Sequence, residues 1–378
     1  MDNRDIGREP LAAVAPAESH ALLDAYFNSA QKLFISAQAS RTGPVKRYFT
    51  LCGKTIELIF ANETLLPYIT PALEHIAAPS TESPALQVFI WDDVTTDTVM
   101  PAPPWFGYAV QKQSGHLEGL YTKRGDVRGF SSSHIKTAYN WSANALSMYD
   151  CNERVALYWT RDARDLPAYE TSAPIRNILN WWAQEHNYHF AHGAAVGTAK
   201  GGVLLAGKGG SGKSTAALAC LNSGLLYASD DYCLVSADPV PSAYSIFSSA
   251  KVDPGNIFRV EHIGPSRGRT GNKYDDKEVF FLYPRFADRI ITGFPLRAIL
   301  LPRITGKPES SISPATQTDG VKALIISTMC QFPGAGKKVV DVMQRLAGAL
   351  PSYHLDFGTD PAQVPSLILD LLDKRKDG

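Results

Sequence analysis

The segment AGKGGSGKST, residues 206 to 215, restricts the fold of this chain more than any other part of the sequence. It contains the pattern G-x-x-x-x-G-K-[ST], whose glycines let a backbone loop wrap closely around phosphate oxygens. The β-prone run GVLLA precedes it, and the helix-forming run TAALACL follows it. Strand, loop and helix in that order are the context that the pattern requires. The sequence therefore predicts a phosphate-binding loop in an α/β fold, and the alternative is a glycine-rich turn that binds nothing.

The residue types in this loop predict how a nucleotide is held. Successive N–H groups can converge on one phosphate, and the helix that begins near Lys213 adds its positive end. Lys213 can reach the β- and γ-phosphates, and the Ser214 hydroxyl can ligate Mg²⁺. We therefore expect ATP and Mg²⁺ to bind here. The residues of the loop predicted to hold the nucleotide are Gly207, Gly209, Gly210, Ser211, Gly212, Lys213, Ser214 and Thr215.

Three further polar residues are expected beside the loop. Asp230 and Asp231 lie in LLYASDDYCLV, at the carboxyl end of the strand expected after the loop helix, and His192 lies in the strand expected before the loop strand. One aspartate can hold Mg²⁺ with Ser214, and the other can accept a proton from an attacking hydroxyl. The residues alone leave that division open, although Ser214 and Asp231 are our predicted metal pair. The predicted catalytic residues are Asp230, Asp231, His192 and Lys213, with a solvated strand-end charge and a buried structural histidine as the alternatives.

Two lysines are candidates for neutralising phosphate charge during transfer. Lys251 and Lys277 are expected near the mouth of the site, and each can equally be a solvated surface residue. We include Lys251 in the predicted nucleotide site. The glycine- and arginine-containing loop 264–277 has the composition of either a lid or an ordinary surface loop.

Composition excludes several classes of function. The 378 residues carry 37 basic and 37 acidic side chains, a formal net charge of +0, so nothing favours nucleic acid or an anionic membrane as partner. The five scattered cysteines form no C-x-x-C pair, which argues against a disulfide framework and a zinc site. We find no signal peptide and no run approaching the roughly 20 apolar residues of a bilayer span. The expected location is the cytoplasm.

Two domains are predicted, residues 1–165 and 166–378, divided within the stretch RDARDLPAYE. The first is expected to be an α+β domain that recognises substrate: a helix from His20, a hairpin around Cys52, a short helix over 65–76, a strand over 86–91 and an antiparallel meander over 107–159. The second is expected to begin with a helix capped by Thr171 or Ser172. After the loop region, strands are expected at 278–283 and 296–304 and helices at about 319–329, 334–349 and 361–374.

Other phosphate-loop proteins need motifs that this chain does not have. Residues 272–275, NKYD, carry the letters of a guanine-reading motif, but they lie in a polar loop without a preceding apolar strand. Neither the D-x-x-G switch motif of GTPases nor the signature sequence of transporter ATPases follows the loop. The acidic pair comes within a few residues of the end of the loop helix, whereas a motor or helicase has a longer core before its acidic strand end. This compact spacing favours a small phosphotransferase.

The order His-Gly, phosphate loop and Asp-Asp resembles the HPr serine kinase/phosphorylase family over about residues 188 to 240. The resemblance implies a fold related to the ATP-dependent phosphoenolpyruvate carboxykinases. It also implies that Lys213 and Ser214 contact triphosphate and Mg²⁺, that Asp230 or Asp231 is the catalytic carboxylate, and that His192 lies beside it. Where the family has a glutamate-arginine-glycine stretch this chain has SIFSSAKVDPGN. The resemblance therefore does not extend to HPr as substrate or to the reverse phosphorylase reaction.

A closer resemblance is to the HPr-kinase-like enzymes of lasso-peptide biosynthesis. It is carried by the runs HGAAVG, LLAGKGGSGKST, SDDYCLV, SAYSIFSSAK and LPSYHLDFG. It implies a kinase that phosphorylates a serine hydroxyl of a peptide, typically at its C-terminus, with residues 1 to about 165 taking part in substrate recognition. The alternatives are a nucleotide-binding regulator without phosphotransfer and a kinase for a small metabolite.

Overall fold

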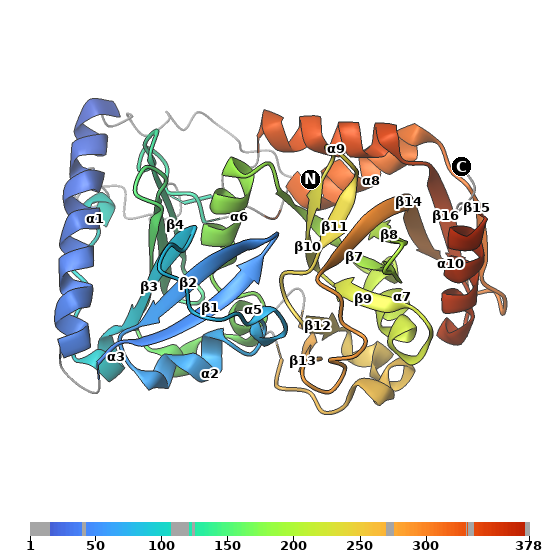
Figure 1. Ribbon diagram of the computed structural model, residues 1–378, viewed down its shortest axis with the longest axis horizontal. Coiled ribbons are helices and arrows are strands. Elements are labelled where there is room, and N and C mark those ends of the chain that lie inside the picture. Colours follow the sequence, from blue (N-terminus) through green and yellow to red (C-terminus); the bar gives the residue numbers. More distant parts are fainter. Residues whose placement is uncertain are drawn as a thin grey trace, which may run out of the picture.

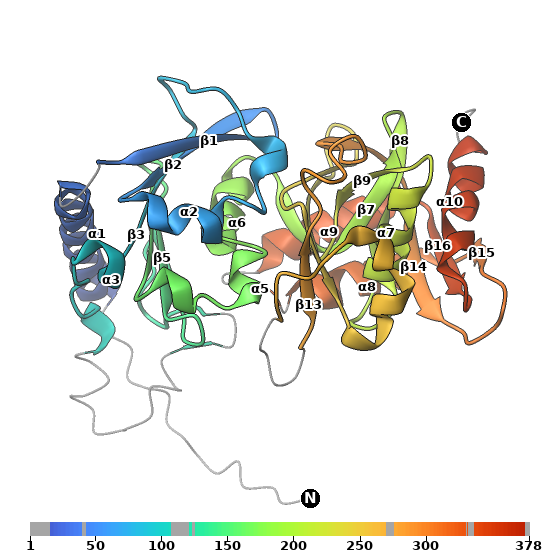
Figure 2. The same ribbon diagram turned by 90° about the horizontal axis from the view of Figure 1, so that it is seen from below.

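The structure is a computed structural model that describes residues 16–39, 43–106, 121–122, 125–269, 276–329, 331 and 336–374. It is a mixed α/β protein with two large sheets, which confirms the expected α/β class. Figures 1 and 2 show the sheets side by side, with α1 (Pro16–Ala39) at one end of the molecule and α10 (Val364–Asp373) at the other. Among the described helices, none combines the length and the apolarity that a bilayer span needs.

The first sheet has six strands in the order β1-β2-β3-β6-β5-β4. The expected hairpin around Cys52 is present, and β4, β5 and β6 pair as the expected antiparallel meander. However, β3 runs parallel to both β2 and β6, so the sheet is mixed. The start of the predicted meander, residues 107–120, lies outside the described residues. The strands are β1 (Val45–Leu51), β2 (Lys54–Phe60), β3 (Leu86–Asp92), β4 (Ile135–Asn140), β5 (Ala145–Asp150) and β6 (Val155–Thr160).

Two predicted helices of the first half have different bounds. α1 begins four residues before His20, at Pro16, a residue that the first turn of a helix tolerates. The single short helix predicted over 65–76 is wrong. Short turns take its place because Pro71 has no N–H to continue a helix and disfavours helical backbone in the residue before it. They are η1 (Glu63–Leu65), α2 (Leu66–Ile69) and η2 (Glu74–Ile76).

The segment that joins the sheets forms α5 (Ala168–Thr171) and α6 (Arg176–Glu185). The predicted cap for α6 is wrong. Thr171 ends α5, and the Ser172 hydroxyl donates to the carbonyl of Tyr169 at 3.0 Å, so both hydroxyls belong to the preceding turn. The apolar residues Ile178, Leu179 and Trp182 of α6 are buried, and the helix packs against both β5 and β7.

The second sheet has eight strands, with the path β11-β10-β7-β8-β14-β16-β15 and β9 paired to β7. β8, β14 and β16 are mutually parallel neighbours, so their carboxyl ends share one edge, and the phosphate loop follows β8 there. The strands of this sheet are β7 (His189–Thr198), β8 (Gly201–Ala206), β9 (Leu226–Ser229), β10 (Tyr232–Ser236), β11 (Ser242–Tyr244), β14 (Gly293–Ile304), β15 (Ser311–Pro314) and β16 (Ser352–Phe357). A separate pair is formed by β12 (Ser249–Val252) and β13 (Glu278–Phe281).

Helices cover the second sheet on both faces. One apolar cluster joins α7 (Lys213–Ala219) and α10 to the sheet, and another joins α8 (Gln317–Met329) and α9 (Lys337–Ala349) to it. The three helices predicted for the C-terminal part are therefore present with shifted ends. α9 and α10 each begin three residues later than predicted, and residues 361–363 form a separate 3₁₀ turn before α10. The division into domains 1–165 and 166–378 falls just before α5 and stays a prediction.

Candidate active site

The phosphate loop is a tight turn between β8 and α7. Gly207, Gly210 and Gly212 have φ angles of 150°, 74° and 100°, a backbone region that residues with a Cβ rarely adopt. The Lys213 ammonium donates to the carbonyl oxygens of Gly207 at 2.8 Å and Lys208 at 3.0 Å. Burial lowers the pKa of Lys213, although Asp230 and Asp231 oppose that shift. The loop thus places a largely buried cation at the start of α7.

Asp230 and Asp231 do not lie within a regular strand. The expected strand over residues 225–235 is wrong, because it breaks at these two residues into β9 and β10. The amide of Tyr232 donates to the Asp230 carbonyl at 2.7 Å, and Asp231 has a φ of 64°. An i to i+2 bond about a residue with positive φ is a strained γ-turn. This turn gives the two carboxylates different surroundings.

Asp230 points toward the phosphate loop. Its Oδ1 accepts a hydrogen bond from the Ser214 hydroxyl at 3.0 Å, and its residue exposure is only 1%. Its Oδ2 is buried without a hydrogen-bond partner. Burial, followed by the charge of Asp231, raises the pKa of Asp230 to about 6. A buried carboxylate oxygen without a partner, beside a hydroxyl and a phosphate loop, fits a site for a hard cation.

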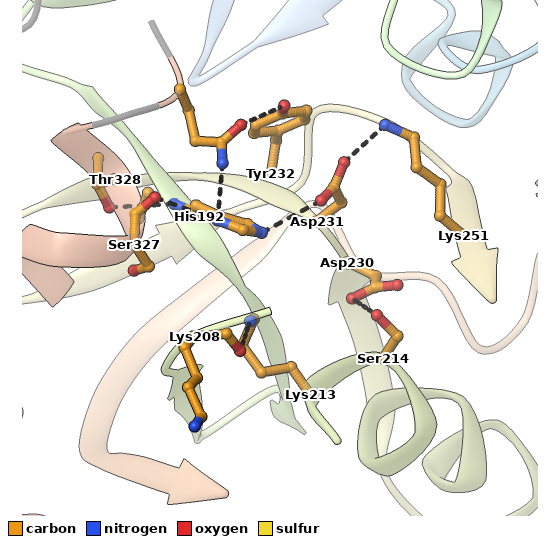
Figure 3. A network of polar contacts seen from close by, with 12 residues as sticks. His192, Lys208, Lys213, Ser214, Asp230, Asp231, Tyr232, Lys251, Ser327 and Thr328 are labelled. Atoms are coloured by element: carbon orange, nitrogen blue, oxygen red, sulfur yellow. Dashed lines mark hydrogen bonds and ion pairs between the residues drawn. The ribbon is translucent and has the colours of Figure 1, made fainter. Parts of the chain in front are cut away.

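Asp231 faces the other way and contacts two basic side chains (Figure 3). Its Oδ1 lies 3.3 Å from Nε2 of His192, and its Oδ2 accepts from the Lys251 ammonium at 2.7 Å. Burial tends to raise the pKa of Asp231, but Lys251 and His192 outweigh it and hold that pKa well below its ordinary value. Asp231 is therefore an ionised carboxylate whose two oxygens are both fixed in place.

Strand pairing brings His192 and Lys251 to Asp231. In the β7–β10 pair His192 stands opposite Tyr232, the residue after Asp231, and Lys251 extends from β12. The Nδ1 of His192 lies 3.1 Å from the Ser327 carbonyl in α8, which fixes the plane of the ring. Gly193 follows His192 because a Cβ there would lie 2.7 Å from the Leu205 carbonyl of β8.

These groups line one cavity of about 650 Å³. The predicted site residues line it, except Gly207 and Asp230. The basic side chains that line the cavity outnumber the acidic ones, so the cavity favours anions. Its basic residues are Arg176, Lys213, Lys251, Arg259 and Lys277, and its acidic residues are Asp231 and Asp253.

The loop predicted over 264–277 is described only at its two ends. Lys277 lines the cavity, and Arg269 pairs with Glu278 at the base of the loop. The NKYD letters at 272–275 lie outside the described residues. In the described part of the chain there is no group of three or more His, Cys, Asp and Glu side chains that could hold a metal. A divalent ion here would therefore need phosphate oxygens or water among its ligands.

The residues at the end of the cavity away from the phosphate loop were not predicted from the sequence. Tyr232, next to Asp231, has its hydroxyl 3.1 Å from Oε1 of Gln331, and the Gln331 amide nitrogen lies 3.3 Å from Nδ1 of His192. Arg176 and Tyr169 complete that end, with the guanidinium 5.9 Å from the centre of the Tyr169 ring. Only Tyr232 carried a sequence signal, its place beside the acidic pair. The others come from segments that tertiary structure alone brings together.

Comparison with known proteins gives little. No family model matches the sequence, and no curated protein matches it. Among solved structures, the chain is similar to the Hpr(Ser) kinase/phosphatase from Coxiella burnetii, with 12% sequence identity and a TM-score of 0.27. That match covers 50% of this chain and 99% of the other. A likeness at that level does not establish a shared family or activity.

Proposed function

We propose that this protein is an ATP- and Mg²⁺-dependent kinase that transfers the γ-phosphoryl group to a serine hydroxyl of a peptide. By the resemblance in sequence, the expected acceptor is the C-terminal residue of a lasso precursor peptide. The observation that carries the proposal is Asp231, an ionised carboxylate held by His192 and Lys251 in the cavity that the phosphate loop lines.

The surroundings of the two aspartates support a different division of work from the predicted one. Asp230, rather than Asp231, contacts Ser214 and has an oxygen without a partner, so we assign Ser214 and Asp230 to Mg²⁺. When bound, Mg²⁺ would neutralise phosphate charge and help to orient the β- and γ-phosphates. Asp231 is then left for the acceptor hydroxyl.

The transfer uses this chain's side chains as follows. The acceptor oxygen forms a bond to the γ-phosphorus of ATP, the bond from that phosphorus to the β,γ-bridging oxygen breaks, and ADP leaves. The hydroxyl proton passes to Asp231, and Lys213 and Lys251 offset negative charge on the phosphates. The loose transition state of phosphoryl transfer needs little basicity, so a carboxylate of low pKa can serve. His192 and Lys251 orient it.

The first half of the chain is proposed to help recognise the acceptor. Tyr169 and Arg176 line the cavity, and Glu170 between them is bound by Asn140 and Tyr158 of the first sheet. The first sheet therefore supports one wall of the proposed site.

The experiment is a comparison of Asp231→Asn with wild type, using Mg²⁺, γ-labelled ATP and a pool of serine peptides. We expect phosphopeptide formation to fall by about 10²- to 10⁴-fold, while the affinity for a fluorescent ATP analogue changes less than about three-fold. Asp288→Asn, at an exposed aspartate outside the cavity, is the matched control. A nucleotide-binding regulator would bind ATP and never produce phosphopeptide with any variant. Full transfer by Asp231→Asn would refute the mechanism.

A further inference from the structure

The cavity has two chemically distinct ends, separated by Asp231. At one end lie the phosphate loop and Ser214, which contacts Asp230. At the other lie Tyr232, Gln331, Arg176 and Tyr169, and Gln331 is linked to Asp231 through His192. Figure 3 shows Lys213 and Ser214 on one side of the aspartates and Tyr232 and His192 on the other. Because attacking and leaving oxygens are roughly in line in phosphoryl transfer, an acceptor must approach from the end opposite the loop.

Arg176 lines this acceptor end of the cavity. Its side chain is 17% exposed, and among the described residues it donates a hydrogen bond only to Glu170, at 2.8 Å. A guanidinium has five N–H donors in a planar fork, so most of its donors remain for a ligand. The fork matches the two oxygens of a carboxylate.

The contacts of Glu170 leave Arg176 able to bind a second anion. Glu170 also accepts from Nδ2 of Asn140 at 3.0 Å and from the Tyr158 hydroxyl at 3.3 Å. Three donors therefore share the charge of the buried Glu170 carboxylate, and this carboxylate holds the Arg176 guanidinium in place. The Arg176 guanidinium carbon lies 5.9 Å from the centre of the Tyr169 ring, within the range of a cation–π contact. A fixed and only partly satisfied cation in a cavity is a preformed anion site.

We propose that Arg176 binds a carboxylate of the acceptor and so selects acceptors that carry one close to the hydroxyl. This inference rests on the proposed kinase function and adds how the acceptor is recognised: Arg176 binds the free terminal carboxylate of the peptide whose last serine is phosphorylated. Arg176 is a specificity-determining residue, and it takes no part in the proton transfer at Asp231.

The test uses two peptide pools, tetrapeptides with serine last and the other positions randomised, made once as free acids and once as terminal amides. We expect wild type to phosphorylate the acid pool at least about ten-fold more efficiently, the effect of a charge-assisted hydrogen bond. Arg176→Lys keeps the ion pair with Glu170 but loses the fork. It should raise KM for the acid pool about ten-fold with little change in kcat.

A second variant tests the role of Arg176 without leaving an unpaired buried charge that could prevent folding. Arg176→Gln alone leaves Glu170 as an unpaired buried charge, so the double variant Glu170→Gln/Arg176→Gln removes both charges together. It should use the acid and amide pools equally. Arg164→Gln, an exposed arginine paired with Asp162 outside the cavity, is the matched control and should keep the acid preference.

The outcomes separate the two proposals. If wild type transfers phosphate to both pools equally, or only to peptides without a nearby carboxylate, the role of Arg176 is refuted while the kinase proposal stands. Unchanged acid preference in both Arg176 variants refutes it as well. If wild type transfers phosphate from ATP to no acceptor, the kinase proposal itself fails.

Discussion

At the scale of single residues, one backbone turn gives two adjacent aspartates opposite properties. The positive φ of Asp231 directs its carboxylate toward His192 and Lys251, whereas Asp230 turns toward Ser214. Burial raises the pKa of one and basic neighbours lower the pKa of the other. Neighbouring carboxyl groups whose pKa values are shifted in opposite directions are typical of active sites in which each group has its own chemical role.

Asp230→Asn should stabilise the protein without nucleotide and weaken binding of Mg²⁺–ATP. In the folded protein Asp230 keeps its proton up to about pH 6, but in the unfolded chain it loses the proton near its ordinary pKa of 3.8. The free energy of unfolding therefore falls as pH rises between those values, by up to about 3 kcal/mol. The Asp230→Asn substitution removes this loss of stability, because asparagine does not ionise. We expect urea unfolding to show Asp230→Asn about 1 to 3 kcal/mol more stable than wild type at pH 7.5 and equal to it at pH 4.

Binding of Mg²⁺–ATP to the same two proteins is the second measurement. Wild-type affinity for Mg²⁺–ATP should fall as pH drops through about 6, because a protonated Asp230 is a poor ligand for Mg²⁺. Asp230→Asn should bind weakly at every pH. Equal stability of the two proteins at pH 7.5 would show that the buried carboxylate carries no destabilising charge.

At the scale of elements, close strand packing sets the position of the site. β7 and β8 pair as an antiparallel hairpin, and glycines occur where neighbouring atoms leave no room for a Cβ. A Cβ on Gly202 would lie 2.6 Å from the Val196 carbonyl and would overlap the Phe294 ring. Since β7 carries His192 and β8 leads into the phosphate loop, a shift between these strands would separate the two halves of the site.

Gly202→Ala should therefore destabilise the protein by about 3 kcal/mol or more through overpacking. The matched control is Gly224→Ala, because a Cβ at Gly224 would meet nothing within 4 Å. That change should be neutral or stabilise by up to about 1 kcal/mol. Soluble yield and urea unfolding measure both. Similar free energies of unfolding for the two variants would contradict the prediction, because they would show that β7 and β8 can move apart to accommodate a Cβ without loss of stability.

At the scale of the whole molecule, the two sheets share one apolar core. A single cluster joins residues of the first sheet, such as Leu58 and Tyr158, through Trp182 of α6 to Phe190 and Phe247 of the second part. The predicted boundary at 165/166 leaves α6 on the side of the second part, although this helix packs against strands of both sheets. Neither part can bury this surface alone, and we expect the chain to unfold as one unit.

Calorimetry should therefore show a single unfolding transition. Trp182→Ala should lower the stability by about 3 to 5 kcal/mol and move the whole transition, because the indole is fully buried. Trp141→Ala, at a tryptophan that is 45% exposed, is the control and should cost less. Two resolved transitions, of which Trp182→Ala moves only one, would instead support two independent domains.

The sequence by itself determined the local part of this protein. The phosphate loop, its flanking strand and helix, the hairpin around Cys52 and the C-terminal helices follow from residue spacing and from the backbone freedom of glycine. The nearness of His192 to the aspartates followed from the resemblance in sequence. Tertiary structure decided the rest: the break between β9 and β10, the turn of Asp230 toward Ser214, and the arrival of Gln331 and Arg176 at the cavity. These features depend on contacts between segments far apart in the chain, and periodicity within a short window carries no information about them.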